Sequence, residues 1–241
     1  MKTAIITGGT SGIGLATAKI FLAHDFNCVL VGRSQTRFDN VKSQLAGNVE
    51  FVSADVRNVD DCNKIVSRAV EIFGGVNVLV NSAGIYSEGA IVDTDEKTFN
   101  DIFSTNVKGT FFVTRAAVDE LIKSHGAIVN VASDAGLRGN YFCAAYSASK
   151  GAVVALTKSL ALELASFPVR VNCVAPADIW TPLTKRQLEL SGATVEDLAQ
   201  VYPLGRIGTA REVAAAIYFL ASEAASFVTG AVLTVDGGLT A

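Results

Sequence analysis

Two side chains four residues apart, Tyr146 and Lys150, are the strongest candidates for acid–base chemistry in this sequence. They fall in an expected helix, Tyr146–Leu164, where residues four apart share a face. A tyrosine normally titrates near pH 10. A lysine ammonium about 4 Å from the phenolate would stabilise it by about 4 kcal/mol at an effective dielectric of 20. The pair therefore predicts a tyrosine with a lowered pKa that can act as a general acid or base.

A glycine-rich turn near the N-terminus is the second candidate. Gly8, Gly12 and Gly14 follow a short apolar run, Thr3–Thr7, and open a helical pattern, Ile13–His24. Such glycines let the backbone approach a pyrophosphate, and the helix N-terminus offers that anion free N–H groups and partial positive charge. Glycine clusters also occur in ordinary strand–helix turns, and this spacing is not the usual G-x-G-x-x-G. Its place at the first such turn favours a nucleotide.

The elements that must position these residues alternate between short apolar runs and longer helical patterns. The expected strands are Thr3–Thr7, Cys28–Val31, Glu50–Ser53, Val76–Val80, Ala127–Val131, Val169–Val174 and Ala231–Val235. The expected helices are Ile13–His24, Gln35–Leu45, Asp60–Phe73, Glu96–Leu121, Tyr146–Leu164 and Arg211–Leu220. Strands that are apolar throughout are buried on both faces. We expect one α/β domain over residues 1–241, a Rossmann-type doubly wound parallel sheet of about seven strands with helices on both faces.

One segment, 181–203, lies outside this alternation. It is bracketed by Pro182 and Pro203 and contains an amphipathic stretch, Leu183–Leu190. Because it follows the carboxyl end of a strand, where ligands of such sheets bind, we interpret it as a small substrate lid. The alternative is a plain surface excursion.

Four motifs resemble those of the short-chain dehydrogenase/reductase family, in its branch similar to 3-oxoacyl-carrier-protein reductases, over nearly the whole chain. They are Thr7-Gly8-x-x-x-Gly12-Ile13-Gly14, Asn81-Ser82-Ala83-Gly84, Ser133, and Tyr146-x-x-x-Lys150, 13 residues beyond that serine. Ser82 and Ala177 depart from the family pattern, which has asparagine and glycine there. The resemblance implies an oxidoreductase that interconverts a carbonyl and a secondary alcohol by hydride transfer from nicotinamide.

The resemblance also implies a role for each matching residue. Tyr146 is the expected acid or base, Lys150 also binds the ribose hydroxyls, Ser133 donates to the substrate oxygen, and Asn106 kinks its helix and holds a water. These four form the expected catalytic set. The expected cofactor-binding residues are Gly8, Thr10, Ser11, Gly12, Ile13, Gly14, Arg33, Ser34, Asp55, Val56, Asn81, Ala83, Gly84, Tyr146, Lys150, Pro176, Ile179 and Thr181.

The end of the second expected strand indicates which nicotinamide cofactor is used. An acid there binds the free ribose of NAD and repels the phosphate of NADP, but this position is Gly32. Arg33 follows, and its guanidinium suits phosphate oxygens; Ser34 and Arg37 could assist. Against this, Thr10 and Ser11 supply no basic residue to the glycine turn, and Arg33 could instead stack on the adenine. We expect NADP(H), with NAD(H) as the less favoured cofactor.

The substrate is less well specified. Proximity to the motifs suggests a pocket formed by Tyr86, Asp134, Tyr141, Phe142, Cys143, Asp178 and Trp180. If Asp134 and Asp178 face this pocket, rather than solvent or turns, they favour a neutral or cationic ketone, diol or sugar. The runner-up is a 3-oxoacyl-carrier-protein reductase of fatty acid synthesis, although the arginines expected for an acidic carrier are missing at 124–125 and 166–168. A non-catalytic nicotinamide-nucleotide sensor is the alternative from another class.

Composition excludes several other functions. The net charge is −3 with both signs scattered, so we expect no nucleic-acid partner. No apolar run approaches the ~18 residues of a membrane span, and the N-terminus does not read as a signal peptide. Four scattered cysteines and two histidines offer no metal site; reduced cysteines fit a cytoplasmic carbonyl reductase. Apolar residues on two faces of 96–121 and 146–164 must be covered, either within the chain or by another copy. The resemblance implies that these helices pair between subunits, so we expect a homotetramer, or failing that a dimer.

Overall fold

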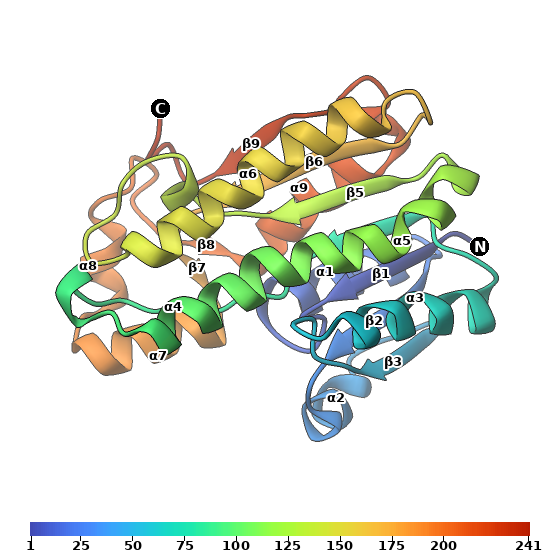
Figure 1. The fold of residues 1–241 in the computed structure, drawn as a ribbon. Coiled ribbons are helices and arrows are strands. Elements are labelled where there is room, and N and C mark those ends of the chain that lie inside the picture. The colour runs from blue at the N-terminus through green and yellow to red at the C-terminus, as the bar shows by residue number, and fades with distance from the viewer.

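Seven parallel strands form one sheet in the order β3-β2-β1-β4-β5-β6-β9 (Figure 1). They are β1 (Thr3–Thr7), β2 (Asn27–Gly32), β3 (Val49–Ser53), β4 (Val78–Asn81), β5 (Ala127–Val131), β6 (Arg170–Pro176) and β9 (Val232–Val235). The strand order changes direction between β1 and β4, which makes the sheet doubly wound. The computed structural model describes all residues 1–241. The predicted Rossmann-type sheet is confirmed.

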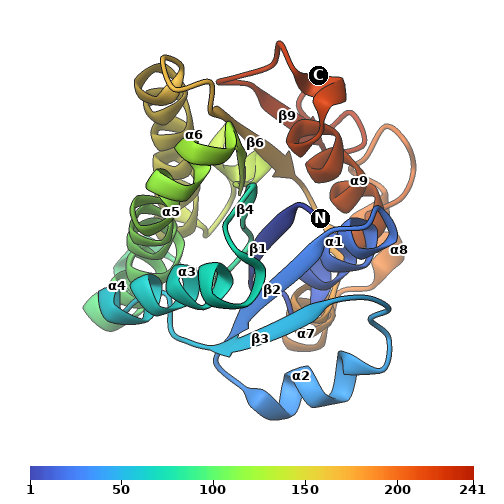
Figure 2. The same cartoon turned by 90° about the vertical axis from the view of Figure 1, so that its right-hand side faces the viewer.

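Helices cover both faces of this sheet, with α3, α5 and α6 on one side and α1 and α9 on the other (Figure 2). The helices are α1 (Gly12–Ala23), α2 (Gln35–Lys42), α3 (Val59–Phe73), α4 (Glu96–Phe103), α5 (Thr110–Ser124), α6 (Ala144–Leu164), α7 (Pro182–Ser191), α8 (Val195–Ala199) and α9 (Ala210–Ala221). Each face has its own apolar core, because neighbouring residues of β1 point to opposite sides: Ile5 packs into one core and Ile6 into the other. This is why the central strands are apolar throughout.

The helix predicted over Glu96–Leu121 is wrong as a single α-helix. It is divided into α4 and α5 by a π-helical stretch, Ser104–Gly109. Inside that stretch the Asn106 side chain is buried and bonds to the backbone of Ile85, a contact from another part of the fold. Wider turns of this kind occur often at functional sites. The two-residue strands β7 (Ile179–Trp180) and β8 (Gly208–Thr209) were also not predicted, since they are too short to show a periodicity.

The segment 181–203 folds into α7 and α8 near the carboxyl ends of the strands (Figure 1). Pro182 occupies the first turn of α7, where a missing N–H costs nothing. The Thr181 hydroxyl caps that turn by accepting from the Thr184 N–H at 3.4 Å. Four residues of α7 line a cavity described below: Pro182, Leu183, Thr184 and Gln187. Leu190, by contrast, is exposed. No helix in the structure combines the length and the apolar character needed to cross a membrane.

Candidate active site

A cavity of about 260 Å³ opens where the strand order changes direction, at the carboxyl ends of β1, β4, β5 and β6. Open α/β sheets place their ligands at this point. Its walls bring together residues from distant parts of the chain: the glycine turn, Gly84 after β4, Ser133 after β5, Tyr146 on α6 and Pro176 at the end of β6. The parallel sheet therefore gathers the predicted motifs at one edge.

Tyr146 and Lys150 lie on one face of α6, as their spacing predicted, but their electrostatics differ from expectation. The Lys150 ammonium is 5.7 Å from the centre of the Tyr146 ring and donates to the Val131 carbonyl at 2.9 Å. Burial raises the pKa of Tyr146 to about 12, with Ser133 acting in the opposite direction. Burial also lowers the pKa of Lys150 to about 8. The predicted lowering of the tyrosine pKa is wrong for the chain alone, because burial dominates and the ammonium is directed to a backbone carbonyl.

Ser133 stands at the carboxyl end of β5, beside Tyr146 in the cavity wall. Its hydroxyl donates to Asp134 Oδ1 at 2.9 Å and accepts from the Ala135 N–H at 3.2 Å. The serine proton thus points to a carboxylate in the chain alone. A substrate oxygen that needs this proton has to displace the bond to Asp134.

Asn106 is positioned by a set of buried bonds. Its Oδ1 accepts from the Ile85 N–H at 2.9 Å, and its Nδ2 donates to the Ile85 carbonyl and to Ser149 Oγ, each at 3.0 Å. Ser149 in turn donates to the Tyr146 carbonyl at 2.7 Å. The Asn106 side chain therefore ties the chain after β4 to the first turns of α6. The water-holding role predicted for it stays a prediction.

The glycine turn has the geometry of an anion site. Gly8 and Gly12 adopt left-handed φ values of +67° and +50°, which favour glycine. A Cβ at Gly14 would collide with the Gly8 carbonyl, so the helix can start this close to the turn only with glycine. The Ser11 side chain caps none of the N–H groups of α1, and no acid occupies the first turn. These N–H groups remain available to a phosphate.

A second cavity, of about 390 Å³, continues from the first on the β2 side of the turn. The two share Gly8, Ser11, Ala83, Gly84 and Ile85, which makes one continuous groove. Most of the other predicted cofactor residues line one of the two cavities: Thr10, Gly12, Ile13, Gly14, Arg33, Ser34, Asp55, Val56, Tyr146, Lys150, Pro176, Ile179 and Thr181. Arg37 joins Arg33 in the second cavity, and no carboxylate stands at Gly32.

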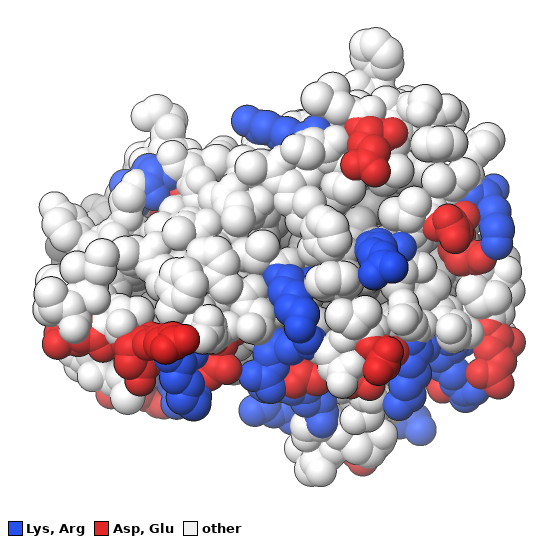
Figure 3. All heavy atoms as spheres, viewed as in Figure 1, with Lys and Arg blue, Asp and Glu red and all other residues white.

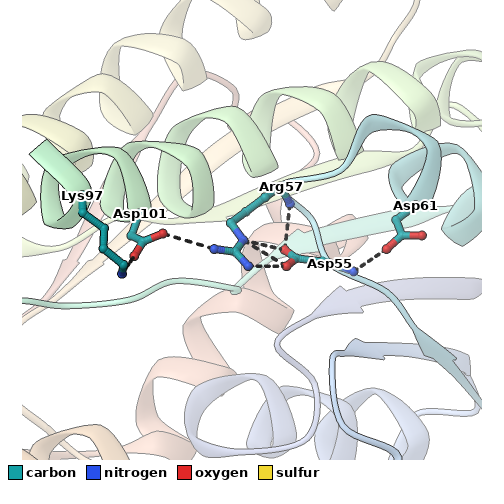
Figure 4. Close-up of polar contacts among 5 residues, drawn as sticks. All are labelled: Asp55, Arg57, Asp61, Lys97 and Asp101. Atoms are coloured by element: carbon teal, nitrogen blue, oxygen red, sulfur yellow. Dashed lines mark hydrogen bonds and ion pairs between the residues drawn. The ribbon is translucent and has the colours of Figure 1, made fainter.

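Asp55, at the floor of the second cavity, is fixed by a neighbouring arginine (Figure 4). Arg57 donates through Nε to both carboxylate oxygens, at 3.1 and 3.0 Å, and through a terminal nitrogen at 2.7 Å. Hydrogen bonding from Arg57 holds the pKa of Asp55 below its usual range. Arg57 also pairs with Asp101 of α4 at 3.2 Å, and Asp101 with Lys97 at 2.7 Å. The Asp55 carboxylate is therefore a charged part of the cavity wall with a fixed orientation.

Several predicted residues lie outside both cavities. Asn81 points into the sheet, where its Nδ2 donates to Thr114 and Asn130. Phe142 and Trp180 are exposed, as is Tyr141. Cys143 is buried, with its Sγ 3.1 Å from the Tyr86 hydroxyl. Asn81 was expected to bind the cofactor from the resemblance. Proximity in sequence placed the other four residues in the substrate pocket, but the direction of a loop side chain depends on the loop's path.

The cavity wall also contains residues that the sequence analysis missed. Thr184 and Gln187 face it from α7, together with Leu183. Their spacing of three along the amphipathic stretch was a usable signal for one helix face. Asn140 lines it from the loop before α6 and had no comparable signal. By contrast, Tyr86, Asp134 and Asp178 line the cavity as the pocket prediction required.

Lys150→Met should stabilise the protein at neutral pH. Burial lowers the pKa of Lys150 from 10.5 to about 8. Keeping the buried ammonium charged at neutral pH therefore costs about 3 kcal/mol. The variant also loses the hydrogen bond to the Val131 carbonyl, which offsets about 1–2 kcal/mol of this benefit. The free energy of unfolding should therefore rise by about 1–2 kcal/mol.

The pH dependence identifies the cause. The cost of the buried ammonium is fully present below pH 8 and disappears as the pH rises toward 10.5. The free energy of unfolding of the wild type should therefore rise relative to that of the variant between these two pH values. Urea unfolding at pH 7 and at pH 10 measures both free energies. A variant that is less stable at pH 7, with a difference independent of pH, would contradict the burial argument.

Comparison with known proteins agrees with this geometry. Residues 8–240 match the family model described as "Enoyl-(Acyl carrier protein) reductase". The chain is 39% identical to the 3-oxoacyl-[acyl-carrier-protein] reductase FabG of Thermotoga maritima, over 99% of this chain and 97% of that one. It is 38% identical to the L-fucose dehydrogenase of Bos taurus, over 98% and 88%. A structure of ElxO with NADP bound is 34% identical and superposes with a TM-score of 0.93, covering 99% of this chain and 98% of that one.

Proposed function

The chain belongs to the short-chain dehydrogenase/reductase family of oxidoreductases, and from this premise we propose that it is an NADP(H)-dependent enzyme that interconverts a carbonyl and a secondary alcohol. One observation carries the proposal. Ser133, Tyr146 and Lys150 meet at a cavity that continues into a groove containing Arg33 and Arg37. A carbonyl reductase needs a proton donor at one end of such a groove and a nucleotide site along the rest.

The residues divide the work of a reduction. NADPH, when bound, supplies the hydride that adds to the carbonyl carbon. As the C=O π bond breaks, Tyr146 transfers its hydroxyl proton to the oxygen; a pKa of about 12 keeps that proton in place at neutral pH. Ser133 turns from Asp134 to donate to the same oxygen as negative charge develops there. The Lys150 ammonium, on the same face of α6, stabilises the resulting phenolate, and the same side chain would hold the nucleotide ribose.

The choice of NADP(H) is supported by charge. Nothing at Gly32 repels a ribose phosphate, and two arginines line the cavity at that end of the groove. The Ser34 hydroxyl accepts from the Arg37 N–H at 3.3 Å, which ties the start of α2 to the same wall. The related ElxO has been solved with NADP, and a tyrosine-to-phenylalanine variant of it with NADPH. The free N–H groups of α1 suit the pyrophosphate.

A free small molecule fits the substrate end better than a carrier-bound acyl chain. The relatives' names include both a carrier-protein reductase and a sugar dehydrogenase. An acidic carrier would be recognised by basic residues at the mouth, but Lys150 is the only cation that lines this cavity, and it is buried. The segment 181–203 would act as the lid, since α7 presents Leu183, Thr184 and Gln187 to the cavity. The test is NADPH consumption with a ketone panel.

Assembly is the next prediction: we expect a homotetramer, with a dimer as runner-up. The face that carries α4, α5 and α6 shows broad uncharged areas (Figure 3). Large apolar side chains on these helices are exposed, with Phe111 at 46% and Leu162 at 83%. A second copy covering this face would bury them. Light scattering should give four times the chain mass, and Leu162→Glu should lower it.

The matched control for assembly is Leu190→Glu. Leu190 is similarly exposed, at 78%, but stands on α7. This change should leave the assembly intact. A wild-type monomer at micromolar concentration would contradict both the tetramer and the dimer.

A further inference from the structure

Two carboxylates line the cavity, but they are not equally free to bind a substrate. Asp134 is 5% exposed, and its Oδ1 accepts from Ser133 Oγ at 2.9 Å. Its Oδ2 lies 3.5 Å from Arg138 Nε, which balances its charge. Asp134 is therefore occupied by protein groups on both oxygens.

Asp178, which follows β6, is held in place with one oxygen unused. The Tyr202 hydroxyl donates to Oδ2 at 2.7 Å and accepts from the Asp178 N–H at 3.0 Å. No protein group donates to Oδ1. Asp178 has no ion pair, and burial raises its pKa. A partly buried carboxylate in this state is stabilised by any ligand that brings it a hydrogen-bond donor.

The rest of the wall favours neutral donors. Asn140, Thr184 and Gln187 present amide and hydroxyl groups to the cavity. The one cation, Lys150, is directed to the Val131 carbonyl and not to Asp178. An anionic group placed beside Asp178 would therefore meet like charge. Arg138, the cation that acts on Asp178 from outside the cavity wall, already pairs with Asp134. A hydroxylated molecule would find an acceptor and several neutral partners.

Resting on the proposed function, we infer that Asp178 is a specificity-determining residue whose Oδ1 accepts a hydrogen bond from a substrate hydroxyl near the reacting carbon. The substrate class is then neutral hydroxyketones and polyols of the sugar type, and not 3-oxoacyl anions. The Tyr202 hydroxyl acts by fixing the carboxylate, so Tyr202 is a positioning residue.

Four matched four-carbon ketones test this on the wild-type enzyme: butan-2-one, 3-hydroxybutan-2-one, 3-aminobutan-2-one and 3-oxobutanoate, each reduced with NADPH. We expect kcat/KM for the hydroxyketone to exceed that for butanone by roughly tenfold or more, as for a hydrogen bond to a charged group. The anion should be the poorest of the four. Equal values for the hydroxyketone and butanone, or an aminoketone preferred over both, would overturn the inference while leaving the reductase function standing. If NADPH were consumed neither with these four ketones nor with any other ketone of a wider panel, both the inference and the reductase function would be wrong.

Asp178→Asn separates recognition from overall activity. When the amide oxygen of the new asparagine accepts the bond from the Tyr202 hydroxyl, its NH₂ group takes the place of Oδ1. A hydrogen-bond acceptor in the cavity is then replaced by a donor. We expect the ratio of kcat/KM for the hydroxyketone to that for butanone to fall at least fivefold, and the ratio for 3-oxobutanoate to that for butanone to rise. Glu189→Gln is the matched control, because it removes one exposed negative charge from α7 without touching the cavity. A variant that keeps the wild-type order of substrates would overturn the assignment; if it does not fold, the wild-type order alone decides.

Discussion

Tyr146→Phe is expected to lower kcat by about a thousandfold, within the 10²–10⁴ that a positioned acid or base contributes. The variant loses the Tyr146 hydroxyl, which belongs to the cavity wall together with Ser133 and lies on the same helix face as Lys150. Its ring should still pack against Tyr86, whose ring centre lies 4.9 Å away. Folding and NADPH binding should therefore persist, as measured by thermal unfolding and by fluorescence titration.

Tyr218→Phe is the control for this loss. Tyr218 is on α9, stacks near His24 and lines neither part of the groove. Removing its hydroxyl should change kcat less than twofold. If Tyr146→Phe kept more than a tenth of the wild-type kcat, the tyrosine could not be the proton donor.

Arg33→Ala is expected to raise KM for NADPH by roughly ten- to a hundredfold while changing KM for NADH little. A guanidinium makes charge-assisted hydrogen bonds to a phosphate, and each such bond contributes about 1.5–3 kcal/mol. That free energy corresponds to the stated change in affinity. NADH has a free 2′-hydroxyl on its adenosine ribose in place of the 2′-phosphate of NADPH, so it has no such bond to lose. Steady-state kinetics with both cofactors, at one salt concentration, measure the difference.

Lys42→Ala is the matched control, since it removes a positive charge from α2 outside the cavity. It should affect both cofactors less than twofold. Equal effects of Arg33→Ala on NADPH and NADH would mean that the arginine stacks on the adenine. A wild-type kcat/KM that favours NADH would contradict the assignment of NADP(H).

The sequence predicted the central sheet better than the helices around it. The limits predicted for β1 and β5 match the structure, because every residue of these strands is buried and the apolar run has clear ends. The resemblance implied a kink at Asn106, but the π-helical stretch Ser104–Gly109 was not predicted as a separate element. It depends on the bonds between Asn106 and Ile85, residues 21 apart, which no local pattern contains.

Local motifs were likewise easier to interpret than the substrate pocket. The glycine turn and the Tyr146–Lys150 pair depend on spacing within one element, and the structure places both at the groove. The pocket depends on loops. Phe142 has a left-handed φ of +54° and is exposed, whereas Tyr202 reaches Asp178 from 24 residues away. The pKa of Tyr146 also escaped prediction, because burial is a property of the whole fold.

The central claim is that the groove transfers hydride and does not merely hold a nucleotide. The most direct test is to mix the wild-type protein with NADPH and a ketone panel that includes 3-hydroxybutan-2-one, and to measure NADPH loss and alcohol formation in the same sample. We expect equal molar amounts of NADP⁺ and secondary alcohol over many turnovers, formed about a thousandfold more slowly by Tyr146→Phe. Tight binding of NADPH with no alcohol formed from any ketone of the panel would contradict the claim and indicate a nucleotide sensor.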